Sequence, residues 1–136
     1  MSDPAPQKRL SDYKLTVFQA AYFDAVAFTD CSSADDEIDN PGICEADFSQ
    51  KFIEESVADC EAFVSANESL LDQAYELRDD YGNASAGDDF WLTRNGHGAG
   101  FWDRGLGAVG KQLSDAAHVY GGVDIYLGDN GLIYGS

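Results

Sequence analysis

The stretch that decides the fold is DFWLTRNGHGAGFWDR, residues 89–104. Residues 90–93 form a short apolar and aromatic run of the kind found in strands. The glycine-rich residues 95–100 are typical of a loop, and residues 101–102 begin a second short strand. The stretch therefore predicts that a helical pattern in the preceding chain gives way here to a sheet.

The chain after this stretch continues the mixed pattern. Apolar residues at helical spacing predict a helix over 106–120, and the Gly-Gly pair that follows is a typical helix stop. Residues 123–127 alternate as a strand, residues 128–131 are a hairpin turn, and residues 132–134 form the return strand. This part is predicted to be ββαββ.

The chain before the stretch is predicted to be mainly helical. A helix is expected over 11–29, with Ser11 as its N-cap. Residues 30–45 have the composition of an acidic loop. A second helical region covers about 47–79, and residues 67–69 leave open whether it is one helix or two.

These elements predict an α+β fold in which N-terminal helices pack on a small antiparallel sheet of strand–strand–helix–strand–strand order. The length fits a single domain over 1–136, made of a flexible arm (1–10), a mainly helical acidic part (11–83) and a ββαββ part (84–136). The predicted core includes Trp91, Phe101, Trp102, Leu113 and Ile125.

Charge is the most unusual property of the composition. The chain has 25 acidic residues against 8 Lys and Arg, a net charge of −17, and residues 30–80 hold sixteen acids and two bases, a net of −14. Direct binding to nucleic acid is not expected, because contacts to phosphates need Lys and Arg. A charge of this size lowers stability through self-repulsion, which suggests that it serves a partner.

The acids of the helical region recur at spacings that return to one helix face, and they predict a surface that binds a basic partner. The expected partner-binding residues are Asp35, Asp36, Glu54, Glu55, Glu61, Glu68, Asp72 and Glu76. The alternative interpretation of this surface is an ordinary solvated face.

The glycine-rich loop offers a second candidate site, formed by Arg94, Asn95, His97 and Asp103. A histidine between glycines with a nearby aspartate has the residue types of a general base and its orienting group. The alternative is structural: the glycines reverse the chain, the tryptophans pack in the core, and Asp103 pairs with an arginine or caps a helix. No cofactor motif occurs, and neither the three cysteines nor the two histidines have the spacing of a metal site, so no cofactor and no metal are expected.

Residues 89–104, together with the 123–134 ending and the ADCEAF stretch at 58–63, resemble a widespread, uncharacterised family of small acidic proteins of bacteriophages and prophages. The resemblance implies a protein of phage origin that acts in the bacterial cytoplasm, and it supplies no catalytic residues. A cytoplasmic location is also expected because no apolar run has the length of a membrane span and no secretory leader is apparent.

The sequence therefore predicts a non-catalytic protein that binds and inhibits a basic, nucleic-acid-binding host protein. A defence system fits this description, and nucleic-acid mimicry against CRISPR effectors or restriction enzymes is the expected mode. Two alternatives stay open. One is a small enzyme or ligand-binding module centred on Arg94, His97 and Asp103, and the other is a phage accessory or regulatory protein without mimicry.

Overall fold

The computed structural model describes residues 9–32, 47–96 and 99–135. Its elements follow in the order η1 (Leu10–Asp12), α1 (Val17–Ser32), α3 (Gln50–Ala66), α4 (Glu68–Leu77), α5 (Asn83–Arg94), η2 (Phe101–Asp103), α6 (Ala108–His118), β1 (Ile125–Leu127) and β2 (Ile133–Gly135). Helices dominate, and one antiparallel hairpin gives the fold its mixed α+β character. No helix within these ranges combines the length and the apolar character that crossing a bilayer requires.

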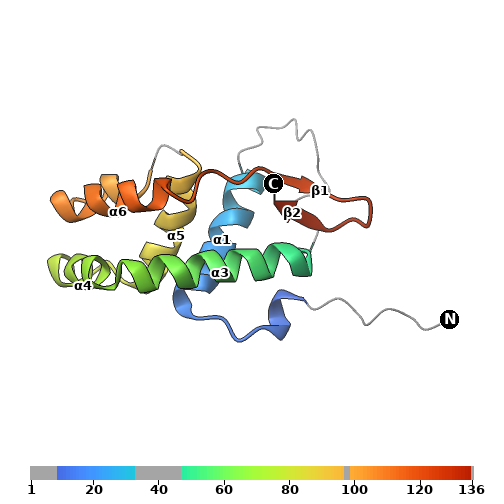
Figure 1. Ribbon diagram of the computed structural model, residues 1–136, viewed down its shortest axis with the longest axis horizontal. Helices are drawn as coiled ribbons and strands as arrows, with labels where there is room; N and C mark the ends of the chain where they lie inside the picture. The colour runs from blue at the N-terminus through green and yellow to red at the C-terminus, as the bar shows by residue number, and fades with distance from the viewer. Residues whose placement is uncertain (1–8, 33–46, 97–98, 136) are drawn as a thin grey trace.

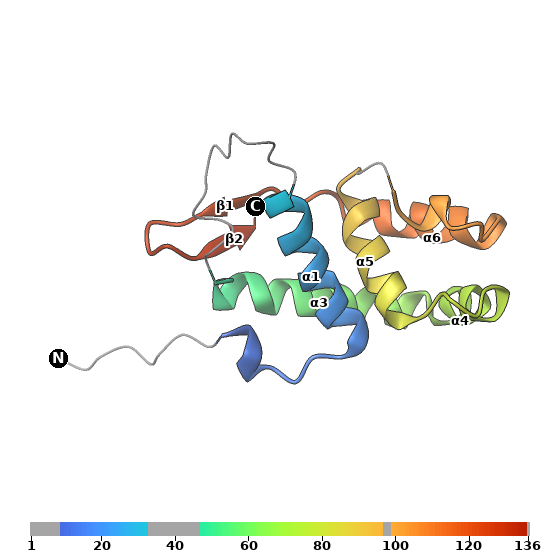
Figure 2. The same ribbon diagram turned by 180° about the vertical axis from the view of Figure 1, so that it is seen from behind.

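The helices form two layers. α1 and α5 pass behind α3 and α6 in Figure 1, and they pass in front of them in the opposite view of Figure 2. α1 and α5 pack closely against each other, and Gly87 on α5 permits this contact. A Cβ atom at Gly87 would collide with the backbone oxygen of Phe18. The absence of a side chain at Gly87 therefore lets α5 approach α1 closely.

α1 begins six residues later than the sequence predicts. Ser11 lies within η1 and is not the N-cap of α1. Thr16 and Gln19 fill that role reciprocally: Gln19 N donates to Thr16 Oγ1 at 3.1 Å, and Thr16 N donates to Gln19 Oε1 at 3.0 Å. This is the capping-box arrangement, in which two side chains satisfy backbone donors of the first turn.

The acidic helical region is two helices. Ser49 caps the start of α3 by accepting a hydrogen bond from Phe52 N at 3.0 Å. Asn67 separates α3 from α4: its backbone N–H and its side-chain amide both donate to Phe63 O, and its own carbonyl accepts from Leu71 N. The two helices nevertheless follow one another end to end in Figures 1 and 2.

The predicted strand–strand–helix–strand–strand order is wrong in its first half. Residues 90–93 belong to helix α5, and residues 101–102 belong to the 3-10 helix η2. A four-residue apolar run has no periodicity that separates a strand from a buried helical turn. The buried face of α5 includes Asp89, Thr93 and Arg94, and these polar residues hide its helical period in the sequence.

The second half of the predicted order is confirmed. α6 ends before the Gly-Gly pair, and β1 pairs with β2 in register Tyr126 to Tyr134 across the turn at 128–131. The hairpin also contacts the chain that leads into α3, because Ser49 N donates to Ile133 O and Ile133 N donates to Asp47 O. This contact attaches the sheet to the start of α3.

Aromatic rings fill the centre between the layers. Phe63 of α3 stacks on Phe90 of α5 with ring centroids 4.3 Å apart, and Trp91 donates from Nε1 to Thr29 Oγ1 at 2.9 Å. The core prediction is confirmed for Trp91, Phe101 and Leu113, while Ile125 is half-buried. Trp102 was expected in the core and is 55% exposed, because the turn of η2 directs Phe101 inward in its place.

Candidate partner-binding surface

The predicted partner-binding residues of α3 and α4 lie on the outside of the molecule. Six of the eight are described, and all six are exposed; we call them the acidic surface: Glu54, Glu55, Glu61, Glu68, Asp72 and Glu76. Buried residues such as Phe52 and Leu71 hold the opposite sides of the two helices against the core. The predicted residues Asp35 and Asp36 lie outside the described part of the chain.

The two ends of the acidic surface differ in how its charges are compensated. Near the start of α3, Glu54 accepts hydrogen bonds from Tyr13 Oη (3.1 Å) and Gln50 Nε2 (3.0 Å), and Glu55 pairs loosely with Lys51 at 3.8 Å. Farther along, no described Lys or Arg forms an ion pair with the remaining four acids, Glu61, Glu68, Asp72 and Glu76. The carboxylates around the α3–α4 junction therefore face solvent without an ion pair to any Lys or Arg in the described part of the chain.

Arg94, one of the loop-site candidates, is buried. Its Nη1 donates to Asp59 Oδ2 at 2.9 Å and to Tyr22 Oη at 3.1 Å, while Nε and Nη2 donate to the carbonyl oxygens of Gly121 and Tyr120. The guanidinium thus ties α5 to α1, to α3 and to the chain after α6. Five donors in a rigid fork suit arginine to such a multiple contact.

The other loop-site candidates do not gather around Arg94. Asn95 donates to Trp91 O at 2.8 Å and accepts from Val123 N at 2.7 Å, so its amide also serves the fold. Asp103 is exposed in η2 and lines a pocket to which neither Arg94 nor Asn95 contributes. His97 lies outside the described residues. Among the described members of this candidate site (Arg94, Asn95 and Asp103), no side chain forms a hydrogen bond or ion pair with another.

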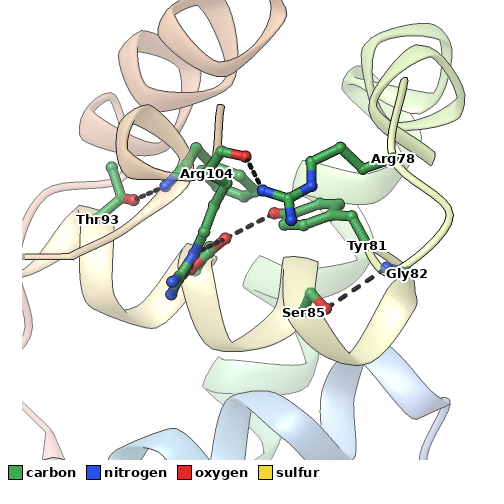
Figure 3. A network of polar contacts seen from close by, with 8 residues as sticks. Arg78, Tyr81, Gly82, Ser85, Thr93 and Arg104 are labelled. Atoms are coloured by element: carbon green, nitrogen blue, oxygen red, sulfur yellow. Dashed lines mark hydrogen bonds and ion pairs between the residues drawn. The ribbon is translucent and has the colours of Figure 1, made fainter. Parts of the chain in front are cut away.

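A second arginine network lies beside that pocket and is drawn in Figure 3. The carboxylate of Asp89 is fully buried; Arg104 donates to it from Nε and Nη2 at 2.8–3.1 Å, and Tyr81 Oη donates to it at 2.7 Å. Arg78 in turn donates to the backbone oxygen of Arg104 at 2.6 Å. The network fastens the chain after η2 to α5 and to the loop before it.

Asp88 lines the same pocket, which has a volume of about 370 Å³. Burial raises the pKa of Asp88 to about 6, and the neighbouring charges of Asp89 and Asp24 act in the same direction. A carboxyl group in this environment exchanges its proton at mildly acidic pH. The pKa of Asp88 therefore reports on its burial and on the charges around this pocket.

Sequence reasoning missed the anionic partners of the two arginines, Asp59 and Asp89. Residues 88–89 are a pair of aspartates beside an aromatic run, and a helical periodicity would have placed the second of them on the same face as the buried Thr93, four residues later. Because residues 90–93 are predicted as a strand, this helical periodicity is not recognised in the sequence. Asp59 follows Phe52, Ile53 and Ser56 closely enough on α3 to border the buried face.

The described residues include no group of His, Cys, Asp or Glu arranged to hold a metal ion. Cys60 is a buried, free thiol whose pKa is raised by burial. In comparisons with known proteins, no family model, no curated protein and no solved structure matches the chain. The resemblance to phage proteins gains no support from these comparisons and stays a prediction.

Proposed function

We propose that the protein binds a basic, nucleic-acid-binding protein through the acidic surface and occupies the groove where that protein holds DNA or RNA. The observation that carries the proposal is the set of exposed carboxylates on α3 and α4, four of which have no ion pair with a described cation. The setting implied by the phage resemblance is inhibition of a host defence system in the bacterial cytoplasm, without catalysis.

The physical basis is electrostatic complementarity. An acidic surface raises the rate of encounter with a basic groove, and carboxylates that lose water against arginine fix the register of the complex. No described cation forms an ion pair with the acids at the α3–α4 junction, and Arg94 and Arg104 pair with Asp59 and Asp89 instead. The acids of α4 remain available to an external partner.

The alternative site around Arg94 has less support from the geometry. Each nitrogen of the Arg94 guanidinium already donates to a neighbour within the fold, and so does the Asn95 amide. A ligand at this place would have to displace hydrogen bonds that join four segments of the chain. The geometry therefore favours the acidic surface as the functional one.

The proposal is tested by capture and displacement. The immobilised protein is incubated with bacterial lysate at low salt, and bound proteins are eluted with rising salt. We expect a basic nucleic-acid-binding protein to elute as salt screens the contact. The purified partner is then loaded with labelled duplex DNA or RNA, and the acidic protein is expected to release it. Capture of a protein that keeps its nucleic acid at saturating acidic protein would contradict occupation of the groove.

A charge-matched variant controls for net charge. Glu68→Gln with Glu76→Gln removes two charges from the acidic surface, while Asp115→Asn with Asp129→Asn removes two exposed charges on α6 and on the hairpin turn. Displacement of the nucleic acid should weaken in the first variant and persist in the second. Equal weakening in both would show that only the total charge matters.

A further inference from the structure

A small groove interrupts the acidic surface beside the junction of α3 and α4. It has a volume of about 260 Å³ and lies between the start of α1 and the last turns of α3. Phe18, Cys60 and Val64 supply apolar lining, and the exposed acids Glu61 and Glu68 border it. The groove is smaller than the ~300–1,000 Å³ of typical small-molecule sites, so its size suits a single side chain.

We propose that this groove receives one arginine side chain of the basic partner, an inference that rests on the function proposed above. The methylene groups of the arginine lie against Phe18 and Val64, and its guanidinium pairs with the carboxylate of Glu61 or Glu68. The groove joins an apolar lining to two carboxylates that form no ion pair with a described cation, and a long cationic side chain complements both features with its apolar stem and its positive head. Charge complementarity thus selects the occupant.

Arginine fits this groove better than lysine. A guanidinium is more weakly hydrated than an ammonium group, packs flat against apolar and aromatic surfaces and forms forked hydrogen bonds with carboxylates. The fold itself holds an arginine in this way: Arg94 lies over the ring of Phe90 at 5.3 Å while Nη1 contacts Asp59. An ammonium group would lose more hydration on entering an apolar groove.

Gln19 adds a polar feature to the wall of the groove. Gln19 is only 5% exposed and lines the groove, and the hydrogen bond from Thr16 N identifies the oxygen end of its amide. The Nε2 end donates no hydrogen bond to a described residue. A backbone carbonyl of the bound segment can accept one. The groove therefore offers acceptors for a cation and a donor for the peptide that carries it.

The test compares two synthetic peptides of equal length and charge, one with four arginines and one with four lysines, each separated by Gly-Ser spacers. Affinities are measured by titration calorimetry at low salt with the whole protein. We expect the wild-type protein to bind the arginine peptide severalfold more tightly. In an NMR titration, the amides of Val64 and Ser65 should shift more with the arginine peptide than with the lysine peptide.

Ser65→Phe fills the groove without changing charge, because Ser65 is exposed and lines it. Ala62→Phe is the matched control: Ala62 is exposed on the same helix but is not part of the lining. We expect Ser65→Phe to lower the affinity for the arginine peptide to that for the lysine peptide, and Ala62→Phe to keep the preference. Thermal melts monitored by circular dichroism check that both variants fold.

Two double variants that each remove two negative charges test the groove a second time, without adding a bulky side chain. Glu61→Gln with Glu68→Gln should abolish the preference for arginine, whereas Asp72→Asn with Glu76→Gln should weaken both peptides equally and preserve it. Equal binding of both peptides by the wild type, or a preference for arginine that survives Ser65→Phe, would overturn the proposal that the groove binds arginine. Either result would leave the proposed function of the acidic surface intact. Failure of the wild type to bind either peptide would overturn the proposed function as well.

Discussion

Nη1 of Arg94 on α5 lies 2.9 Å from Oδ2 of Asp59 on α3, and the arginine side chain is only 4% exposed. α3 thus carries two kinds of acidic residue, one that is paired within the fold and one that is exposed. Asp59 is compensated from inside the fold, whereas Glu61, two residues later, is exposed and has no ion pair with a described cation. The fold therefore uses Arg94 for cohesion and leaves Glu61 without an ion pair to any cation that the structure describes.

Arg94→Ala should destabilise the protein by about 3 kcal/mol, the lower end for a broken buried pair, because Asp59 keeps partial access to water. The variant also leaves Tyr22 and two backbone carbonyls without their donor. Urea unfolding measures the change. Lys51→Ala, which breaks an exposed pair with Glu55, is the control and should cost less than about 1 kcal/mol. Near-equal losses in both variants would contradict the structural role of Arg94.

Gly87→Ala tests the close packing of α1 on α5. Alanine favours a helix by up to about 1 kcal/mol over glycine, but the added Cβ meets the Phe18 backbone, and overpacking typically costs about 1–3 kcal/mol. We therefore expect a net loss of stability in a thermal melt. Gly82→Ala at the start of the same helix, where a Cβ meets nothing within 4 Å, should change stability by less than about 1 kcal/mol. A stabilised Gly87→Ala would refute the packing.

Asp88 should give the protein a measurable pH dependence. Its pKa is raised from 3.8 to about 6 in the folded state, so folding favours the protonated form. The stabilising contribution is complete below about pH 4 and is lost as the pH rises through 6. Unfolding in urea at pH 4 and pH 7 should show a larger fall in stability for the wild type than for Asp88→Asn. Identical pH dependences would contradict the assigned environment, in which Asp24, Asp89 and Arg104 are the neighbouring charges.

Truncation of the two tryptophans should lower stability by very different amounts. Trp91 is 2% exposed and donates to Thr29, so Trp91→Ala should cost about 3–5 kcal/mol. Trp102 is 55% exposed, and Trp102→Ala should cost much less, although both residues occur in the same aromatic stretch. Equilibrium unfolding of the two variants tests this directly. A larger loss for Trp102→Ala would contradict the placement of Trp91 in the core and of Trp102 at the surface.

The sequence predicted the parts of this fold whose periodicity is clean. The alternation in 123–127, the turn at 128–131 and the amphipathic pattern of α6 all led to the observed elements. α5 was mistaken for a strand because its buried face carries Asp89, Thr93 and Arg94 beside small residues. The exposure of the acids on α3 and α4 followed from their helical spacing. The internal pairing of Arg94 and Arg104 did not, because ion pairs between distant segments leave no local pattern.

The central claim is that the acidic surface, and not the total charge, binds the partner. The decisive measurement is the dissociation constant of the captured basic protein, by calorimetry at fixed salt, for two variants of equal net charge. Glu61→Lys with Glu68→Lys reverses two exposed acids at the α3–α4 junction, and Asp115→Lys with Asp129→Lys reverses two exposed acids on α6 and the hairpin turn. Lost desolvated pairs cost roughly 2–5 kcal/mol each, so the first variant should bind at least about 100-fold more weakly, while the second should stay within a few-fold of the wild type. Equal affinities of the two variants would contradict the account.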